Sequence, residues 1–366
     1  MPTLFDKVYG CIAGSNCGAA FAYPTEGMSY EAIVSKYGEV KNFETVVKKE
    51  RLKKKSWGPD WHTKSMEHIA GMTEDGIERQ RLVSTAIIEK DGRVTIEDVA
   101  RIWVRDITPD KFGYLLGNQD QIIYYLFKAG FPPPDVGRYV PWPGLIGTSK
   151  MVHPIGIINA CNPRQAALDA FDVTRLRDTR FRPKNFSIEV AGAIAAATAE
   201  AMKPKATVNS IIDTALGILS EEPRQELKEN LDMASEHPDV SELRVAFYQK
   251  YVGHNGSNAV EAVSEALALF LVTDGNVEMS IRGAANFGRD TECIACTVGG
   301  IAGALRGIEA VPQKWVDTVE AALRQDKYTV SNRSLKETAE GLYQALKNNL
   351  AQIQEQLDMC EAQMQD

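Results

Sequence analysis

Two short acidic segments, far apart in the chain, carry the residue types best suited to chemistry. They are "GMTEDG" at 71–76 and "GRDTEC" at 288–293. Each precedes a run with apolar residues at helical spacing, so each is predicted to open a helix. The first turn of a helix stabilises carboxylates through its unpaired N–H groups and its dipole. Ordinary capping, with Thr73 and Thr291 as the hydroxyl residues, therefore explains either segment taken alone.

The helix expected after Glu292 favours a chemical role as well. Its sequence "CIACTVGGIAGALRG" (293–307) has three interior glycines, and each weakens a helix by about 1 kcal/mol relative to alanine. Such a helix is expected at the centre of a fold, where backbones approach closely, and its first turn would lie beneath a cleft. If both segments face that cleft, four carboxylates converge: Glu74, Asp75, Asp290 and Glu292. Oxygen ligands of this kind suit Mg²⁺ or Mn²⁺. Capping and metal binding both stay open at this point.

Helical spacing dominates the rest of the chain, and strand patterns and hairpin signals are scarce. Helices are predicted at 73–89, 95–107, 186–202, 207–219, 258–273 and 291–307. Two long segments, 43–72 and 131–185, read as irregular loops because they are rich in Pro, Gly and basic residues. The prediction is an all-α fold with one domain at 1–325 and a helical tail at 326–366.

The tail has apolar residues at 342, 346, 350, 353, 357, 360 and 364, a spacing of roughly three heptads. Such a helix either pairs with another subunit, which would make a homo-oligomer, or lies back on its own domain. The sequence leaves both interpretations open.

Composition limits the classes of partner. The 366 residues carry a net charge of −8, which argues against a nucleic-acid-binding surface. The basic segment "KKERLKKK" (48–55) reads as a solvated face. Six scattered cysteines indicate reduced thiols. We expect no signal peptide, no membrane span and a cytoplasmic location.

Three blocks of the chain resemble the ADP-ribosylglycohydrolase family, which includes the dinitrogenase reductase-activating glycohydrolase. The first is the Gly-rich segment 10–33 with its Pro-x-Glu-Gly ending, and the second is 73–75 in place of a Thr-Asp-Asp. The third is the long segment 258–317, with 290–292 in place of an Asp-x-Asp. The resemblance implies an all-α fold around a metal-lined cleft. It also implies hydrolysis at C1 of a ribose, in ADP-ribose attached to a protein or in a related ribosyl compound.

The resemblance implies one or two Mg²⁺ ions held by Thr73, Glu74, Asp75, Asp290 and Glu292. A metal can hold ribose hydroxyls and orient water, while a carboxylate acts as the base. The candidates for this proton transfer are Glu26, Glu74 and Asp75; Glu26 matches a glutamate that some family members use. The candidate substrate contacts are Asn286, Gly288, Arg289, Gly147 and His153, and further candidates, for a diphosphate, are Lys150, Arg164 and Arg182.

The chain also departs from the family pattern. Ala19 stands where the family has an aspartate, and Cys293 stands where it has a Thr or Ser ligand. Glutamates at 74 and 292 lengthen each arm by one methylene and shift a ligand by roughly 1.5 Å. We therefore expect at most one well-held ion, or a site of altered geometry. The altered middle segment 147–158 favours a substrate other than ADP-ribosyl-arginine, such as a simpler N-riboside. A binding or regulatory module without turnover is the alternative.

Overall fold

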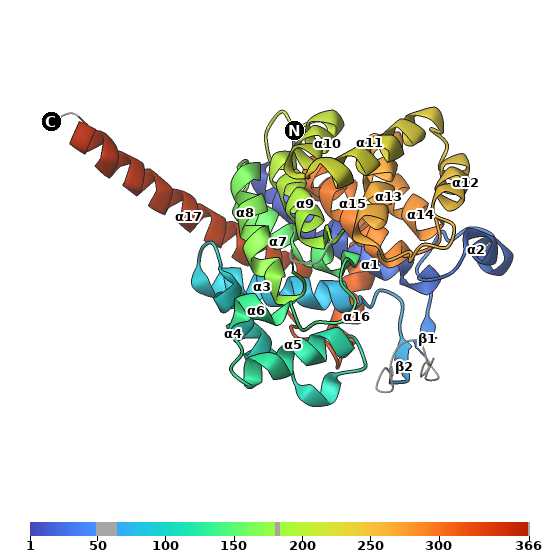
Figure 1. Cartoon of the computed structure of the whole chain (residues 1–366), viewed down its shortest axis with the longest axis horizontal. Coiled ribbons are helices and arrows are strands. Elements are labelled where there is room, and N and C mark those ends of the chain that lie inside the picture. The colour runs from blue at the N-terminus through green and yellow to red at the C-terminus, as the bar shows by residue number, and fades with distance from the viewer. Residues whose placement is uncertain (49–63, 180–183, 365–366) are drawn as a thin grey trace.

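The computed structural model describes residues 1–48, 64–179 and 184–364, and its regular structure there is almost entirely helical (Figure 1). The α-helices are α1 (Leu4–Ala22), α2 (Tyr30–Tyr37), α3 (Asp75–Lys90), α4 (Ile96–Asp106), α5 (Asn118–Lys128), α6 (Pro133–Val136), α7 (His153–Ile158), α8 (Pro163–Val173), α9 (Ser187–Ala201), α10 (Val208–Ile218), α11 (Glu221–Glu236), α12 (Val240–Lys250), α13 (Ala259–Val272), α14 (Val277–Ala285), α15 (Thr291–Arg306), α16 (Gln313–Gln325) and α17 (Leu335–Met364). Short 3-10 helices are η1 (Tyr23–Thr25), η3 (Pro109–Lys111), η4 (Ile146–Met151), η5 (Thr174–Leu176) and η6 (Ile308–Ala310). The all-α prediction is confirmed, and the six helices expected from apolar spacing are α3, α4, α9, α10, α13 and α15.

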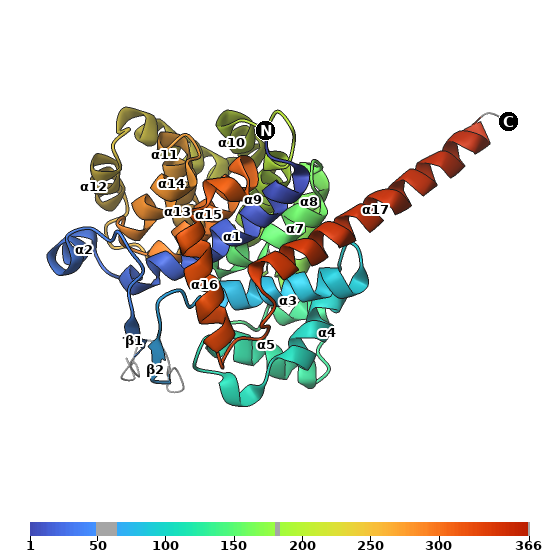
Figure 2. The same ribbon diagram turned by 180° about the vertical axis from the view of Figure 1, so that it is seen from behind.

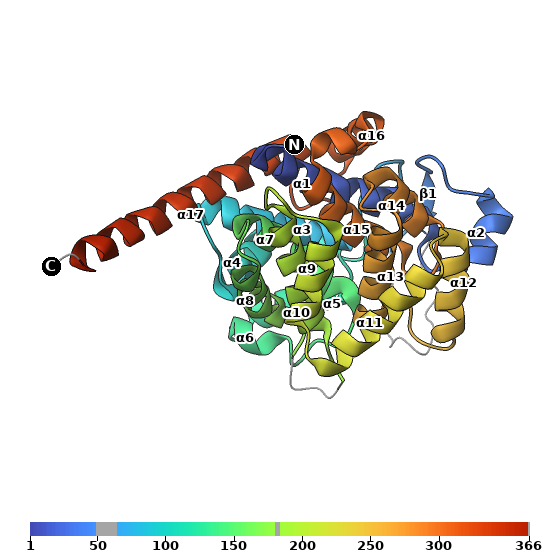
Figure 3. The same ribbon diagram turned by 90° about the horizontal axis from the view of Figure 1, so that it is seen from above.

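The first and fifteenth helices form the centre of the fold. A β-carbon on Gly14 would lie 2.1 Å from the carbonyl oxygen of Gly299, and one on Gly299 would lie 2.3 Å from that of Gly14. No side chain fits between the two backbones, so α1 and α15 touch directly. The close approach predicted for the glycine-rich helix is confirmed. Helices α9, α13 and α14 also pack on α15, and Figure 3 shows the pair surrounded by the other helices.

The sequence-based picture was wrong in two places. Strands β1 (Val46–Lys48) and β2 (Met66–His68) form an antiparallel pair, although no hairpin was expected. Each strand has only three residues, too few to show an alternating pattern. The segment 131–185 contains α6, α7 and α8 instead of an irregular loop. Each of these helices has proline in its first turn, where the backbone N–H has no partner within the helix and its loss costs nothing. The prolines that suggested a loop therefore mark the starts of helices. The basic segment 48–55 lies outside the described residues beyond Lys48, and so does Arg182.

Helix α17 divides into two parts. Leu335, Leu342 and Leu346 are buried where its first turns pack on α1, α3 and α7. Its second part extends away from the body into solvent, as the views from both sides show (Figures 1 and 2). Leu350, Ile353 and Leu357 are 46%, 51% and 47% exposed there. No helix in the described part of the chain has the length and apolar character needed to cross a membrane.

Candidate active site

The two acidic segments meet, and a lysine joins them. Nζ of Lys150 lies 2.9 Å from Oδ1 of Asp75 and 2.6 Å from Oε2 of Glu292. Asp75 begins α3, Glu292 is in the first turn of α15, and Lys150 comes from η4. The predicted convergence of the two helix starts therefore holds for these carboxylates. The group between them is an ammonium of this chain, which sequence spacing gave no reason to expect.

Lys150 is held in this place by its surroundings. The residue is 4% exposed, and Gln80 Nε2 donates a hydrogen bond of 2.8 Å to its carbonyl oxygen. A β-carbon on Gly76 would lie 2.5 Å from Cε of Lys150, so the side chain passes directly over Gly76. Burial disfavours the charged ammonium, but Asp75 and the other nearby acids outweigh it and raise the pKa of Lys150 well above its usual range. The lysine is a charged, buried part of the site.

Asp75 is engaged on its other oxygen as well. Arg79 Nη2 donates to Asp75 Oδ2 at 2.6 Å, and the same guanidinium makes two 2.8 Å bonds to the fully buried Asp120. Arg177 adds a third bond to Asp120, at 2.7 Å. Burial opposes ionisation of Asp75, but the charges of Arg79, Lys150 and Arg177 hold its pKa far below its usual range. A carboxylate so stabilised is a weak base.

The carboxylates nearest the start of α15 have fewer partners. Ligand atoms of Asp290, Glu292 and Cys293 all lie within 4.8 Å of one another. Asp290 is the N-cap of α15, with Oδ1 accepting from the Cys293 amide at 3.4 Å. Oε1 of Glu292 is buried and has no hydrogen-bond partner among the described residues. Burial, then the charge of Asp290, raises the pKa of the Cys293 thiol well above its usual value, so the thiol is neutral. The oxygens of Asp290 and Glu292 are thus the suitable ligands for a hard cation.

Capping by Thr73 and Thr291 was the simpler explanation of the two acidic segments, but neither threonine is the N-cap of its helix. The residue preceding α3 is Glu74, whose side chain makes no capping bond, and Asp290 caps α15. The hydroxyl of Thr291 instead donates to Ala22 O at 3.0 Å, tying α15 to α1. Thr73 is buried, and its carbonyl oxygen lies 3.2 Å from Nε2 of His68.

Glu74 faces the small sheet. Its Oε1 lies 3.9 Å from Nε2 of His68, and the His68 ring stacks on Tyr23 with ring centroids 3.8 Å apart. The pair between β2 and the start of α3 forms only because the chain turns between them.

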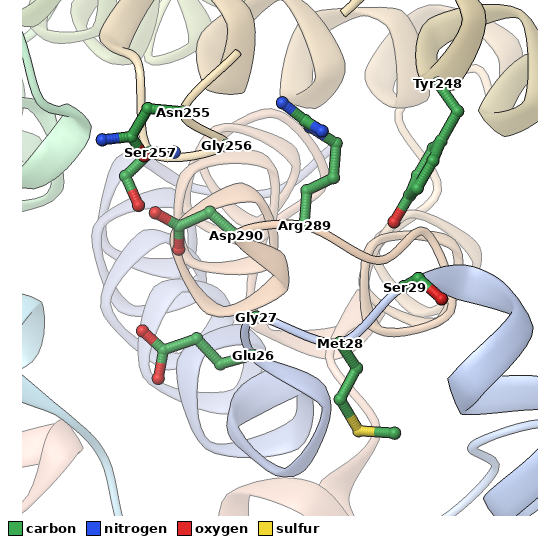
Figure 4. Close-up of a pocket in the computed structure, with 10 residues that line it drawn as sticks. All are labelled: Glu26, Gly27, Met28, Ser29, Tyr248, Asn255, Gly256, Ser257, Arg289 and Asp290. Atoms are coloured by element: carbon green, nitrogen blue, oxygen red, sulfur yellow. Dashed lines mark hydrogen bonds between the residues drawn. The ribbon is translucent and has the colours of Figure 1, made fainter. Parts of the chain in front are cut away.

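A pocket of about 400 Å³ opens beside Asp290 (Figure 4). Its lining comes from three stretches of chain: Glu26, Gly27, Met28, Ser29, Tyr248, Asn255, Gly256, Ser257, Arg289 and Asp290. Backbone bonds from Gly27 N to Arg289 O, 2.7 Å, and from Arg289 N to Met28 O, 2.9 Å, hold two of these stretches together. In Figure 4 the carboxylates of Glu26 and Asp290 project in the same direction. The N-terminal loop and the start of α15 thus build one site.

Glu26 carries a strongly shifted carboxyl group. The residue is exposed to the pocket, but desolvation by the surrounding protein, and then the charges of Glu74, Asp290 and Glu292, raise its pKa to about 8. At neutral pH the protonated form is therefore favoured in the absence of a bound cation. A protonated carboxyl at a pocket wall is suited to donate a proton.

Arg289 lines the pocket, and Gly288, which precedes it, does not. Gly288 has φ +89°, and a β-carbon there would lie 2.1 Å from the hydroxyl oxygen of Tyr248, so only glycine fits. The Arg289 guanidinium lies 5.7 Å from the Tyr248 ring centroid, donates through Nη2 to His254 O at 3.2 Å, and bonds through Nε to Oε1 of Glu261. Arg289 is thus fixed at the pocket edge as a positioned cation.

Behind Arg289 lies a buried acid pair that sequence reasoning missed. Glu261 and Glu265 are fully buried, one turn apart on α13. Burial raises the pKa of Glu261 to about 7 against the opposing charge of Arg289. Burial, then the charge of Glu261, raises the pKa of Glu265 well above its usual range, and neither of its oxygens has a hydrogen-bond partner among the described residues. The sequence does carry a signal: two glutamates four residues apart in a helix whose other residues, except Ser264, are apolar.

Three other predicted substrate residues lie away from the pocket lining. Asn286 clamps Val40, accepting from its amide at 2.8 Å and donating to its carbonyl at 3.1 Å. Gly147 adjoins the two guanidinium groups bound to Asp120; a β-carbon there would lie 3.0 Å from Arg177 Nη2. His153 lies in the core against Gly300 of α15.

His153 is fully buried at the start of α7. Its Nε2 lies 3.3 Å from Thr297 O and its Nδ1 lies 3.4 Å from Gln80 Nε2. A β-carbon on Gly300 would lie 2.1 Å from Nε2, so the ring fills the space that glycine leaves on α15. Burial lowers the pKa of His153 to about 4, which keeps the ring neutral. These contacts give His153 a packing role.

Comparison with known proteins agrees with this architecture. The family model for ADP-ribosylglycohydrolase matches residues 1–351. A solved structure described as an ADP-ribosylglycohydrolase-related protein complex aligns with a TM-score of 0.62 at 16% identity, covering 94% of this chain and 100% of that one. At that identity the likeness speaks for the fold. No curated protein matches the sequence. The family match spans both acidic segments and the helices that present them, and the chain belongs to the ADP-ribosylglycohydrolase family.

Proposed function

We propose that this protein is a hydrolase that cleaves a glycosidic bond at C1 of a ribose, with nitrogen or oxygen as the leaving atom. The substrate class is an ADP-ribosyl group or a simpler N-riboside. The observation that carries the proposal is that Glu26 and Asp290 line one pocket of about 400 Å³, with a ligand oxygen of the buried Glu292 within 4.8 Å of one of Asp290. A pocket of that size is within the range of small-molecule sites.

The residues present fit one divalent cation, Mg²⁺ or Mn²⁺. The unpartnered buried Oε1 of Glu292 and the carboxylate of Asp290 are hard oxygen donors close together. Glu74 and Thr73 remain the proposed further ligands. A bound ion of this kind would polarise ribose hydroxyls and orient water. The neutral thiol of Cys293 adds no ligand for a hard ion.

The chain's own carboxyl groups divide the proton transfers between them. Glu26, whose pKa is raised to about 8 by desolvation and the neighbouring carboxylates in the ion-free site, is the candidate to protonate the leaving atom of a substrate in the pocket. Glu74 is the better candidate for the base that accepts a proton from water. Asp75, which sequence reasoning offered for this role, is bound to Lys150 and Arg79 and serves instead to position Lys150. Arg289 faces the pocket as a fixed cation for an anionic or hydroxyl-bearing part of the substrate.

The test is release of free ribose or ADP-ribose from a panel of nucleosides, N-ribosides, ADP-ribosyl peptides and O-acetyl-ADP-ribose in the presence of Mg²⁺. We expect Asp290→Asn to lower the rate by at least about a hundredfold, because it removes the negative charge of a proposed ligand of the cation. Asp317→Asn, on the exposed face of α16, is the matched control and should leave the rate unchanged. Release that survives both chelation and Asp290→Asn contradicts the proposal.

A binding or regulatory module is the second candidate, and one observation favours it. Lys150 neutralises Asp75 and Glu292, two carboxylates that a family hydrolase is expected to use for metal. Tight binding of ADP-ribose or a nucleoside, with no release from any member of the panel, would select this function over hydrolysis.

We also propose a partner for the exposed part of α17, within the tail predicted at 326–366: a second copy of this chain. With Leu350 and Leu357 at heptad position a, Ile353 and Cys360 fall at position d. In an antiparallel pair Leu350 lies opposite Cys360, and Ile353 opposite Leu357, of the second copy.

Charge supports this register. Lys347 and Glu361 both fall at position e, where antiparallel helices face each other, so the pair forms two reciprocal Lys347–Glu361 contacts. The remaining flanking positions, 349, 354, 356 and 363, carry only Asn or Gln. Self-association therefore meets no like-charge repulsion along the seam.

A further inference from the structure

The acidic residues around the site form two clusters with different charge balance. In the inner cluster, three carboxylates face three cations at nitrogen–oxygen distances of 2.6 to 2.9 Å: Asp75, Asp120 and Glu292 with Lys150, Arg79 and Arg177. The outer cluster holds Glu26 and Asp290, which line the pocket, and Glu74, whose charge acts on Glu26. The inner cluster is neutral without any added ion, whereas the outer one carries excess negative charge once its groups ionise.

The fold also leaves room for the Lys150 side chain to reach the inner cluster. The stem of Lys150 passes over Gly76, where a β-carbon would lie 2.5 Å from Cε and 2.6 Å from Cδ. Its backbone is fixed by Gln80 of α3. The nitrogen therefore reaches Asp75 and Glu292 by a path that the fold leaves open for it.

We propose that the ammonium of Lys150 takes the place of one divalent ion, so that this chain binds at most one such ion, at Asp290 and the free oxygen of Glu292. This inference rests on the cation site of the proposed function and limits that site to one ion. The distances of 2.6 and 2.9 Å suit a charge-assisted hydrogen bond, whereas Mg²⁺ takes oxygen at about 2.0–2.1 Å. A dication between Asp75 and Glu292 would displace Lys150. It would also share the Asp75 carboxylate with the positively charged Arg79.

The test counts bound ions and does not depend on turnover. Equilibrium dialysis with Mn²⁺, read by electron paramagnetic resonance, should give no more than one ion per wild-type chain. Lys150→Met keeps the length and apolar stem of the side chain but frees two carboxylate oxygens, so it should bind one ion more than wild type. Adding Asp75→Asn to Lys150→Met should abolish the gain.

A matched control comes from α1. Lys7 is another buried lysine, and its Nζ donates to the carbonyl oxygens of Ala201 and Lys203 at 2.6 and 3.0 Å. Lys7→Met removes a buried charge elsewhere in the fold and should leave the ion count unchanged. Circular dichroism establishes that each variant is folded before ions are counted.

Two results would overturn the inference: two ions bound to wild type, or no gain in folded Lys150→Met. If Lys150→Met does not fold, the wild-type count decides alone. Failure of the proposed hydrolysis is separable, because a protein that releases no ribose from any substrate can still show the expected ion counts.

Discussion

Gly14 of α1 and Gly299 of α15 lie so close that a β-carbon on either would fall within 2.3 Å of the other's carbonyl oxygen. The contact joins two helices whose positions in the chain are almost 300 residues apart, and it fixes where α15 begins relative to the N-terminal loop. Glu26 follows α1, and Asp290 precedes α15. Their placement at one pocket is therefore a consequence of this backbone contact.

Gly14→Ala should strongly destabilise the protein. The added methyl group meets backbone on α15, which cannot turn aside, so the two helices must separate along their length. We expect a loss of at least about 3 kcal/mol in the free energy of unfolding, the upper end for overpacked cores. Urea denaturation measures it. Gly217→Ala is the control, because this glycine lies on the exposed face of α10 with open space around it. It should raise the free energy of unfolding by about 0.5–1 kcal/mol. Equal stability of the two variants would contradict the packing described here.

Asp120→Asn should leave the buried Arg177 guanidinium without its carboxylate partner and Arg79 with Asp75 alone. Arg79 and Arg177 both bond to this fully buried carboxylate. Breaking a buried ion pair by removing one partner costs about 3–5 kcal/mol of stability. Asp135→Asn breaks the exposed pair with Arg138, 3.6 Å apart, and should cost less than about 1 kcal/mol. Thermal or urea unfolding of both variants decides whether the network is structural as we describe it.

Acid should destabilise the protein through His153. Its pKa is about 4 in the folded state, against 6.5 for the ordinary side chain, so the unfolded state binds the proton first as pH falls. This contribution is complete above pH 6.5 and is lost between about pH 6.5 and 4, a loss of about 3 kcal/mol.

His153→Gln lacks this titration, so the stability difference between wild type and variant should shrink by about that amount from pH 7 to pH 4. Urea unfolding at a series of pH values provides the measurement. Parallel pH profiles for the two proteins would show that the ring is not held neutral in the interior.

The antiparallel pairing of α17 predicts a charge-reversal rescue. Glu361→Lys places like charges opposite each other twice per dimer and should weaken association roughly tenfold. Lys347→Glu combined with Glu361→Lys restores opposite charges and should recover the wild-type dissociation constant. Sedimentation equilibrium gives both constants. A chain that is monomeric at every accessible concentration, or a double variant no better than the single one, would contradict the proposed register.

The sequence predicted much of the fold because the signals were local. Apolar residues at helical spacing placed α3 and α15, and the glycines of α15 predicted a close neighbour. The acidic segments at the starts of these helices were expected to converge, and Asp75 and Glu292 do so.

What the sequence did not predict depends on tertiary packing. Lys150 reaches two carboxylates only because η4 runs beside Gly76, and no spacing along the chain encodes that approach. His153 was a candidate for substrate because it stood in a segment expected to be a loop. Proline at the second position of α7 instead starts a helix and carries the ring into the core.

The contact between α1 and α15 can form only late in synthesis, because its two helices lie near opposite ends of the chain. Synthesis at about 5–20 residues per second leaves an interval of roughly 15–60 s between the emergence of the first helix from the ribosome and that of its partner. Throughout that interval the glycine-lined face of α1 has no neighbour to cover it. A nascent chain that stalls before α15 is complete would expose the surface on which the whole fold is later assembled, and would be a natural client for chaperones.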